Sequence, residues 1–291
     1  MNRKSFIETM VSATGMLTLG HTLKSLSESL PVQDEIMPVL FIGHGSPMNG
    51  IDENEFTRAW KQLAAEIPKP KAILCVSAHW LTTGTFVTAM PKPETIHDFG
   101  GFPKALFDVE YPALGDPALA KEVAGMVKSA QVGLDDRWGF DHGAWSVVKP
   151  MYPNADIPML QLSIDYYKPA QYHYDLAKEL KGLRKKGVLI IGSGNMVHNL
   201  GLATFGNFNA PGFDWALEMN EHFKKHILDG NHQPLINYSS FGRAATLAIP
   251  SPDHYFPLMY SLGLQDKGEK VSIFNDKAVA GALTMTSVRI G

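Results

Sequence analysis

The sequence predicts an α/β protein, a single domain with a mostly parallel central sheet that is covered by helices on both faces. Three observations support this prediction. Short, continuous apolar runs of strand length recur along the chain, segments with helical periodicity alternate with them, and no linker or internal repeat interrupts residues 36–291. We therefore expect one domain over residues 36–291, preceded by an extension of residues 1–35.

The first half of this domain contains three predicted strands and two predicted helices. Apolar runs predict strands at 39–42, 72–77 and 85–89, and apolar spacing predicts a helix at 53–66. A second helix is expected at 117–129. It follows Asp116, a residue type that commonly accepts hydrogen bonds from the free N–H groups of a first helical turn.

The second half continues the alternation. We expect strands at 157–164 and 188–191, and a long helix at 169–185 that begins with Pro169 in its first turn. Further helices are expected at 213–228 and 253–262, and late strands at 271–274 and 282–288. Ligands of such sheets bind beyond the carboxyl ends of the strands, so those ends are where we look for a site.

The extension of residues 1–35 differs from the rest of the chain. Two basic residues, Arg3 and Lys4, precede a modest apolar stretch that resembles an export leader, but polar residues interrupt it and no clear cleavage site follows. The other interpretation is an accessory surface helix with an apolar stripe. We expect the accessory helix and a cytoplasmic location, with export as the alternative. No run reaches the length of about 20 apolar residues that a membrane span needs.

The composition excludes several classes of function. The chain has 291 residues, and 26 basic against 29 acidic residues give it a net charge of −3 with neutral histidine. Nucleic-acid binding needs clustered positive charge, so we expect no nucleic-acid partner. The single cysteine, Cys75, excludes an intrachain disulfide and any multi-cysteine metal site, and it lies in an apolar run typical of a buried strand.

Histidine carries most of the chemical information in this sequence. His44 lies between two glycines directly after a predicted strand, His79 follows the next buried strand, and His198 follows the strand at 188–191. His254 lies at a helix start. Each could be a hydrogen-bonded core histidine, but four at strand or helix ends favour a metal site. A cysteine-free histidine set suits zinc, iron, copper or nickel better than magnesium or calcium.

Two further histidines lie in segments rich in glycine and aromatic residues. His142 is flanked by glycines and tryptophans in WGFDHGAW (138–145), and we consider either a pocket wall with an adjustable proton donor or a packing loop. His97 lies in IHDFGGFP (96–103), a segment that either lines a cleft for an aromatic ligand or packs as a loop. The other histidines have helical or polar surface contexts and receive no role.

Six segments together resemble the DOPA extradiol dioxygenase family, which belongs to the class III extradiol ring-cleaving dioxygenases and is related to the catalytic subunit of protocatechuate 4,5-dioxygenase. The resemblance runs from about residue 37 to residue 291, in the family's motif order. The segments are GHGSPM (43–48), SAHW (77–80), IHDFGGFP (96–103), GFDHG (139–143), GSGNMVHN (192–199) and DHY (253–255).

The resemblance implies a role for each histidine of the site. It makes His44, His79 and His254 ligands of one divalent metal per chain, and His198 the active-site base or a fourth ligand. It makes His142 a contact for substrate or oxygen. From the context of its loop, we also expect His97 to contact the substrate. The protocatechuate-type enzymes have a glutamate where His254 stands here. An all-histidine site is expected to hold zinc on isolation, whereas turnover with oxygen is expected to need Fe(II).

These residues predict a metal-dependent extradiol dioxygenase that opens the ring of a catechol such as DOPA with molecular oxygen. A small-molecule catechol and oxygen would then be its partners. Two alternatives use the same residues. Three histidines and a water also describe a zinc-dependent hydrolase, and a zinc- or aromatic-ligand binder without turnover would keep the same site.

Overall fold

The computed structural model describes Leu30 and residues 35–291. The accessory helix or leader expected within residues 1–35 therefore lies almost entirely outside the described residues. Leu30 itself is half-buried and packs against the core. In the described part of the chain, no helix combines the length and the apolar character that a membrane crossing requires.

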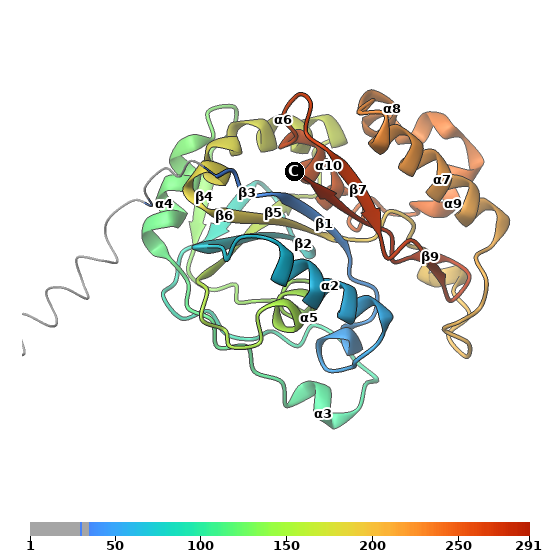
Figure 1. Cartoon of the computed structure of the whole chain (residues 1–291), viewed down its shortest axis with the longest axis horizontal. Helices are drawn as coiled ribbons and strands as arrows, with labels where there is room; N and C mark the ends of the chain where they lie inside the picture. The colour runs from blue at the N-terminus through green and yellow to red at the C-terminus, as the bar shows by residue number, and fades with distance from the viewer. Residues whose placement is uncertain (1–29, 31–34) are drawn as a thin grey trace, which may run out of the picture.

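The central sheet has eight strands in the order β4-β3-β5-β2-β6-β1-β10-β7 (Figure 1). Its middle strands β5, β2, β6 and β1 are all parallel, β3 is antiparallel to β5, and β10 is antiparallel to β1. The predicted α/β class and mostly parallel sheet are thus confirmed. The strands are β1 (Val39–Gly43), β2 (Ala72–Thr82), β3 (Thr85–Thr88), β4 (Val132–Asp135), β5 (Met159–Asp165), β6 (Val188–Gly194), β7 (Val271–Phe274) and β10 (Ser287–Ile290).

Side chains of the buried strands alternate between two hydrophobic cores. In β1, Val39 and Phe41 join one core, while Leu40 and Ile42 join the other. The first core contains α4 (Pro117–Met126), α6 (Ala170–Glu179), α7 (Asp214–Leu228) and α10 (Phe256–Gly263). The second contains α2 (Glu55–Glu66) and α5 (His142–Met151), which lie on the opposite side of the sheet (Figure 1). Helices therefore cover both faces, as predicted.

Shorter elements complete the described structure. The strand expected at 282–288 is divided in the structure. Its first part is β9 (Leu283–Thr284), which pairs with β8 (Ala278–Val279) in a two-stranded sheet, and its last part belongs to β10. The remaining helices are α3 (Lys104–Phe107), α8 (Gln233–Ile236) and α9 (Arg243–Ala248), with 3-10 turns at Pro47–Gly50, Lys181–Lys186, Leu200–Leu202 and Tyr238–Phe241.

Several element boundaries differ from the prediction, and two of these differences place site residues. Strand β2 continues to Thr82, so His79 lies inside it rather than after it, beside an irregularity in pairing between Val76 and Leu81. Helix α10 begins at Phe256, so His254 precedes the helix. The helix expected at 169–185 ends at Glu179 and continues as a 3-10 turn.

Candidate metal centre and active-site cavity

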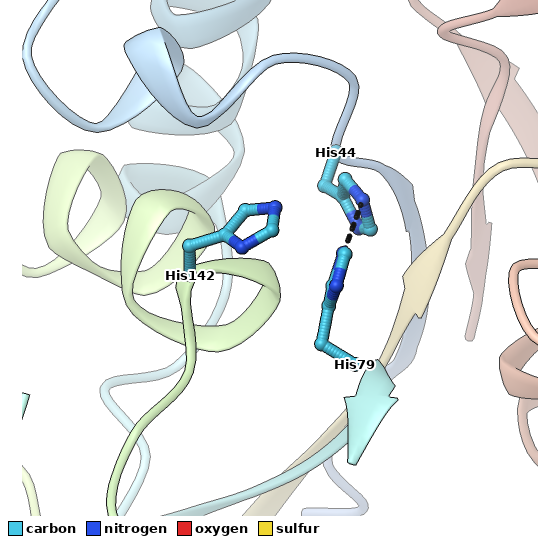
Figure 2. Close-up of side chains that lie close together, drawn as sticks. All are labelled: His44, His79 and His142. Atoms are coloured by element: carbon cyan, nitrogen blue, oxygen red, sulfur yellow. Dashed lines mark hydrogen bonds between the residues drawn. The ribbon is translucent and has the colours of Figure 1, made fainter. Parts of the chain in front are cut away.

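Five of the six histidines singled out in the sequence line one cavity of about 540 Å³. His44 follows β1, His79 lies in the last part of β2, and His198 follows β6, so three parallel strands deliver them to the same edge of the sheet. His142 is the first residue of α5, and His254 precedes α10. Figure 2 shows His44, His79 and His142 pointing toward one another.

The hydrogen bonds of His44 determine which of its nitrogens faces the cavity. Ser193 Oγ donates its proton to the carbonyl oxygen of Gly143 at 2.5 Å. The same Oγ lies 3.0 Å from His44 Nδ1, so it accepts a hydrogen bond from that nitrogen. His44 is therefore protonated on Nδ1, and the lone pair of Nε2 is free for a ligand.

His79 faces His44 with the same orientation. Its Nδ1 lies 3.4 Å from Asp98 Oδ2, and its Nε2 lies 3.3 Å from His44 Nε2. A metal bound between the two rings would take the lone pair of each Nε2, with the proton of His79 on Nδ1 beside Asp98. A tetrahedral metal at about 2.0–2.1 Å from two nitrogens separates them by about 3.3–3.4 Å. The observed spacing fits a shared metal ion.

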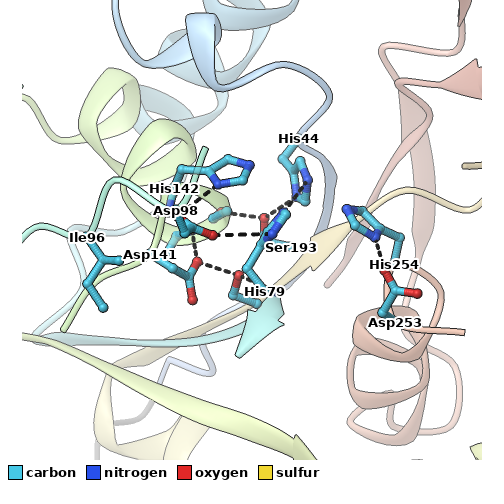
Figure 3. Close-up of polar contacts among 12 residues, drawn as sticks. His44, His79, Ile96, Asp98, Asp141, His142, Ser193, Asp253 and His254 are labelled. Atoms are coloured by element: carbon cyan, nitrogen blue, oxygen red, sulfur yellow. Dashed lines mark hydrogen bonds and ion pairs between the residues drawn. The ribbon is translucent and has the colours of Figure 1, made fainter. Parts of the chain in front are cut away.

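His254 approaches this pair from the other side of the cavity. Its ring centroid lies 5.1 Å from that of His44 and 5.0 Å from that of His79. Its Nδ1 lies 2.5 Å from Asp253 Oδ2, which leaves Nε2 available (Figure 3). A carboxylate that holds one nitrogen of a histidine while the other binds a metal is a common support of metal sites.

His142 and His198 stand next to these three. His142 Nδ1 lies 2.9 Å from Asp98 Oδ1, and its ring centroid lies 3.9 Å from that of His79. His198 stacks on His254 with centroids 3.5 Å apart and ring planes within 6°. Potential ligand atoms lie within 4.8 Å of one another in two groups, the first of His44, His79 and His142 and the second of His198, Asp253 and His254.

Burial keeps the imidazoles of His44, His79, His198 and His254 neutral. Burial and the neighbouring histidines lower the pKa of His44 and of His254 well below the usual value. Burial, followed by the charge of His142, lowers the pKa of His79 to about 4, and burial lowers the pKa of His198 to about 4. Because a metal binds neutral imidazole, these side chains need to release no proton near neutral pH.

Asp98 is one of the functional residues whose role is not evident from the sequence. Besides its contacts with the rings of His79 and His142, it accepts a hydrogen bond from the backbone N–H of His142 at 2.9 Å. Burial alone would raise its pKa, but the hydrogen bonds and charge of His142 and the charge of His79 hold it below the usual value. The available signal was its place beside His97 in a segment rich in glycine and phenylalanine.

His97 is the one predicted site residue that the structure does not bring into the cavity. Its Nε2 lies 2.9 Å from the carbonyl oxygen of Val109, and its ring packs near Phe99 and Trp145. Phe99 lines the cavity, whereas His97 is not among the lining residues. His97 therefore supports the cavity wall from behind.

A buried carboxylate fixes the start of α5, where His142 stands. Asp141 is fully buried and accepts hydrogen bonds from Ser77 Oγ at 2.6 Å, from Gln161 Nε2 at 2.6 Å and from the N–H of Ala144 at 3.1 Å. The last of these caps the helix. The orientation of His142 is thus set from both sides, by Asp141 through the backbone and by Asp98 through the ring.

The fold and this site together define an α/β protein with a cavity that is lined by five histidines and by phenylalanine and leucine side chains. Residues 12–287 match the family model described as the catalytic LigB subunit of aromatic ring-opening dioxygenase. The chain belongs to this family. It is an extradiol ring-opening dioxygenase, an oxidoreductase, and its family implies a metal-dependent reaction. The predicted class of enzyme is thus confirmed. The family match favours it over the two alternatives, a zinc-dependent hydrolase and a binder without turnover.

Proteins of similar sequence span nearly the whole chain. The 4,5-DOPA dioxygenase extradiol of Escherichia coli K12 is 48% identical over 259 residues, which cover 88% of this chain and 95% of that protein. The protein of the same name from Beta vulgaris is 33% identical over 265 residues, 88% of this chain and 97% of that protein. A crystal structure of an uncharacterized protein from E. coli K12 matches with a TM-score of 0.76 and 43% identity, covering 88% of this chain and 100% of that chain.

Proposed function

We propose that this chain opens the ring of a DOPA-type catechol beside its two hydroxyl groups, at one divalent metal held by His44, His79 and His254. One observation carries the ligand assignment. Ser193, Asp98 and Asp253 each lie beside the Nδ1 atom of one of these histidines, which directs three Nε2 atoms to one cavity. Asp98 also lies beside Nδ1 of His142, and the choice of His254 over His142 follows the family resemblance. The choice of DOPA rests on the relatives, which bear the name 4,5-DOPA dioxygenase extradiol.

Fe(II) is the proposed metal of turnover, and zinc is the metal expected on isolation. Fe(II) bound by the three histidines would supply the redox chemistry with oxygen that zinc lacks. Three protein ligands would also leave positions open for the catechol. The nitrogen donors fit either metal, so metal content and metal of turnover must be measured separately.

His198 is the proposed base for the reaction. Its ring lines the cavity beside His254, and its lowered pKa keeps it neutral near neutral pH, so it can accept a proton from a catechol hydroxyl. The alternative role is a fourth metal ligand, since His198 belongs to the second group of potential ligands.

His142 is the proposed contact for substrate or oxygen. Asp98 lies beside its Nδ1, so the ring can present its other nitrogen to the cavity and move a proton there. Phe99 lies beside it in the cavity wall, with ring centroids 5.6 Å apart, and Phe102 packs against Phe99. These apolar rings would limit the access of water to the reacting ring.

The test is an oxygen-uptake measurement on metal-free protein reloaded without oxygen, with Fe(II) in one sample and Zn(II) in another. After addition of DOPA and oxygen, the Fe(II) form should consume one oxygen molecule per DOPA and produce a visible absorption band. The Zn(II) form should consume none. Tight binding of DOPA to the Fe(II) form without oxygen uptake would contradict the proposal, as would hydrolysis of an ester or amide by the Zn(II) form.

A further inference from the structure

The cavity extends well beyond the histidines, and that part of its wall is apolar. Residues 99–102 and residues 200–208 supply most of it, and Leu283 of β9 adds to it. The side chains that shape this outer part are Phe99, Phe102, Leu200, Phe205, Phe208 and Leu283. The whole cavity, about 540 Å³, lies within the range that holds drug-sized ligands. It therefore has room for a substituent in addition to one catechol ring.

The charges of the wall are as informative as its apolar groups. Among the described residues that line the cavity, there is no lysine or arginine, and Asp98 is the only carboxylate. Asp98 is already engaged by His79 and His142. A substituent that ends in a carboxylate would find no cationic side chain there, and burying an unpaired charge is costly.

The outer wall also exposes large apolar side chains to water. Phe205 is 75% exposed, Leu200 is 49% exposed and Phe208 is 45% exposed. An apolar substituent that lies against these side chains removes apolar surface from water on both partners, which favours binding. A charged substituent gains little from the same contact.

We propose that this site selects catechols with an uncharged apolar substituent, alkyl or aryl, at ring position 4, over catechols whose side chain ends in a carboxylate. The inference rests on the proposed function and names its preferred substrate class. DOPA remains a substrate, with its charged groups directed to the water at the cavity mouth. Its kcat/KM is then lower than that of an apolar catechol of similar length.

The test compares kcat/KM on the Fe(II)-loaded full chain for DOPA and for four further catechols. These are 4-methyl-, 4-ethyl- and 4-propylcatechol and 3-(3,4-dihydroxyphenyl)propanoate, which carries a carboxylate on a chain of similar length. Each added methylene should raise kcat/KM by up to about fourfold. 4-Propylcatechol should exceed the propanoate by about tenfold to a hundredfold.

Two variants locate the effect in the outer wall. Phe205→Ala should reduce the gain per methylene, because it removes apolar contact area. Leu200→Arg should raise kcat/KM for the propanoate at least threefold relative to 4-propylcatechol. Leu228→Arg is the matched control, since Leu228 is 54% exposed at the end of α7 and does not line the cavity.

The possible outcomes distinguish a failure of the apolar preference from a failure of the proposed ring cleavage. If neither DOPA nor any of the four catechols is cleaved, the proposed ring cleavage itself is overturned. If DOPA is cleaved but 4-propylcatechol is not, the function stands and the apolar preference is overturned. If the catechols are cleaved but the propanoate equals or exceeds 4-propylcatechol, the function stands and the apolar preference is overturned. The preference is also overturned if Leu228→Arg changes the ratio as much as Leu200→Arg does.

Discussion

At the scale of single residues, Ser193, Asp98 and Asp253 each hold the Nδ1 atom of one histidine and thereby select the nitrogen that faces the cavity. Such partners fix the tautomer and the ring orientation of a metal ligand. The histidines stand out in the sequence by their positions at strand ends, whereas nothing in the sequence indicates a role for these three supporting residues. The reason is physical: each contact depends on a side-chain orientation that only the folded structure defines.

We predict that His44→Ala, His79→Ala and His254→Ala each lose most of the bound metal. A three-ligand site has no spare protein donor to replace the missing nitrogen. Elemental analysis after dialysis measures the effect. His222→Ala is the control, because the side chain of His222 is 45% exposed on α7 and should leave metal content unchanged. One full metal equivalent in all three ligand variants would rule the assignment out.

His198→Ala and His142→Ala should behave differently from the ligand variants. Both should keep near-full metal content, and His198→Ala should lower turnover by about 10²–10⁴-fold, the usual contribution of a positioned acid or base. Metal content, catechol binding and oxygen uptake are measured on the same Fe(II)-loaded preparations. Loss of metal from His198→Ala would instead make it a fourth ligand, and His142 would become the next candidate for the base.

Asp98→Ala should weaken metal binding by about 10–100-fold, because His79 would lose the group that orients it. Competition with a metal chelator measures the affinity, and circular dichroism checks that the fold is kept. Asp136→Ala, at an exposed position, serves as the control. An affinity equal to that of the unmodified protein would mean that Asp98 does not support the site.

At the scale of helices and strands, the sequence predicted the buried parallel strands well, because they form unbroken apolar runs. It did not predict α5, in which nine of ten residues are buried and Pro150 lies inside the helix. A helix without a polar face shows no helical periodicity, so 138–145 resembled a packing loop. Strand β4 and helices α3, α8 and α9 were also missed, and all of them are short.

The structure confirms that Asp116 caps helix α4, and the contribution of this cap to stability can be measured. Asp116 accepts hydrogen bonds from the N–H groups of Ala118 and Leu119 at 3.0 and 2.9 Å. Asp116→Ala should lower the free energy of unfolding by about 0.5–2 kcal/mol and leave metal content unchanged. Urea denaturation measures the change. Equal stability of Asp116→Ala and the exposed control Asp136→Ala would show that the cap contributes nothing.

At the scale of the whole molecule, the site is assembled from segments that are far apart in the chain. His44 and His254 belong to opposite ends of the sequence, yet their ring centroids lie 5.1 Å apart. The rule that ligands bind at the carboxyl ends of parallel strands predicted a shared edge for His44, His79 and His198. It could not predict that His97 packs behind the wall, since that depends on the path of a loop.

The division of the chain at residue 36 stays a prediction. If residues 1–35 form only an accessory segment, a chain that starts at Ile36 should fold and keep its metal. Circular dichroism and elemental analysis of the shortened chain measure both properties. Insoluble or metal-free shortened protein would show that the segment belongs to the core. Recovery from cells of a chain already cut near Gly20 would favour export instead.

The most direct test of the central claim is a crystal structure of the zinc-loaded protein, with an anomalous difference map to locate the metal. The account predicts one zinc ion per chain, at about 2.0–2.1 Å from the Nε2 atoms of His44, His79 and His254. His142 should lie outside bonding distance and remain beside Asp98. A single ion bound instead by His142 with His44 and His79, or by His198 with Asp253 and His254, would contradict the account.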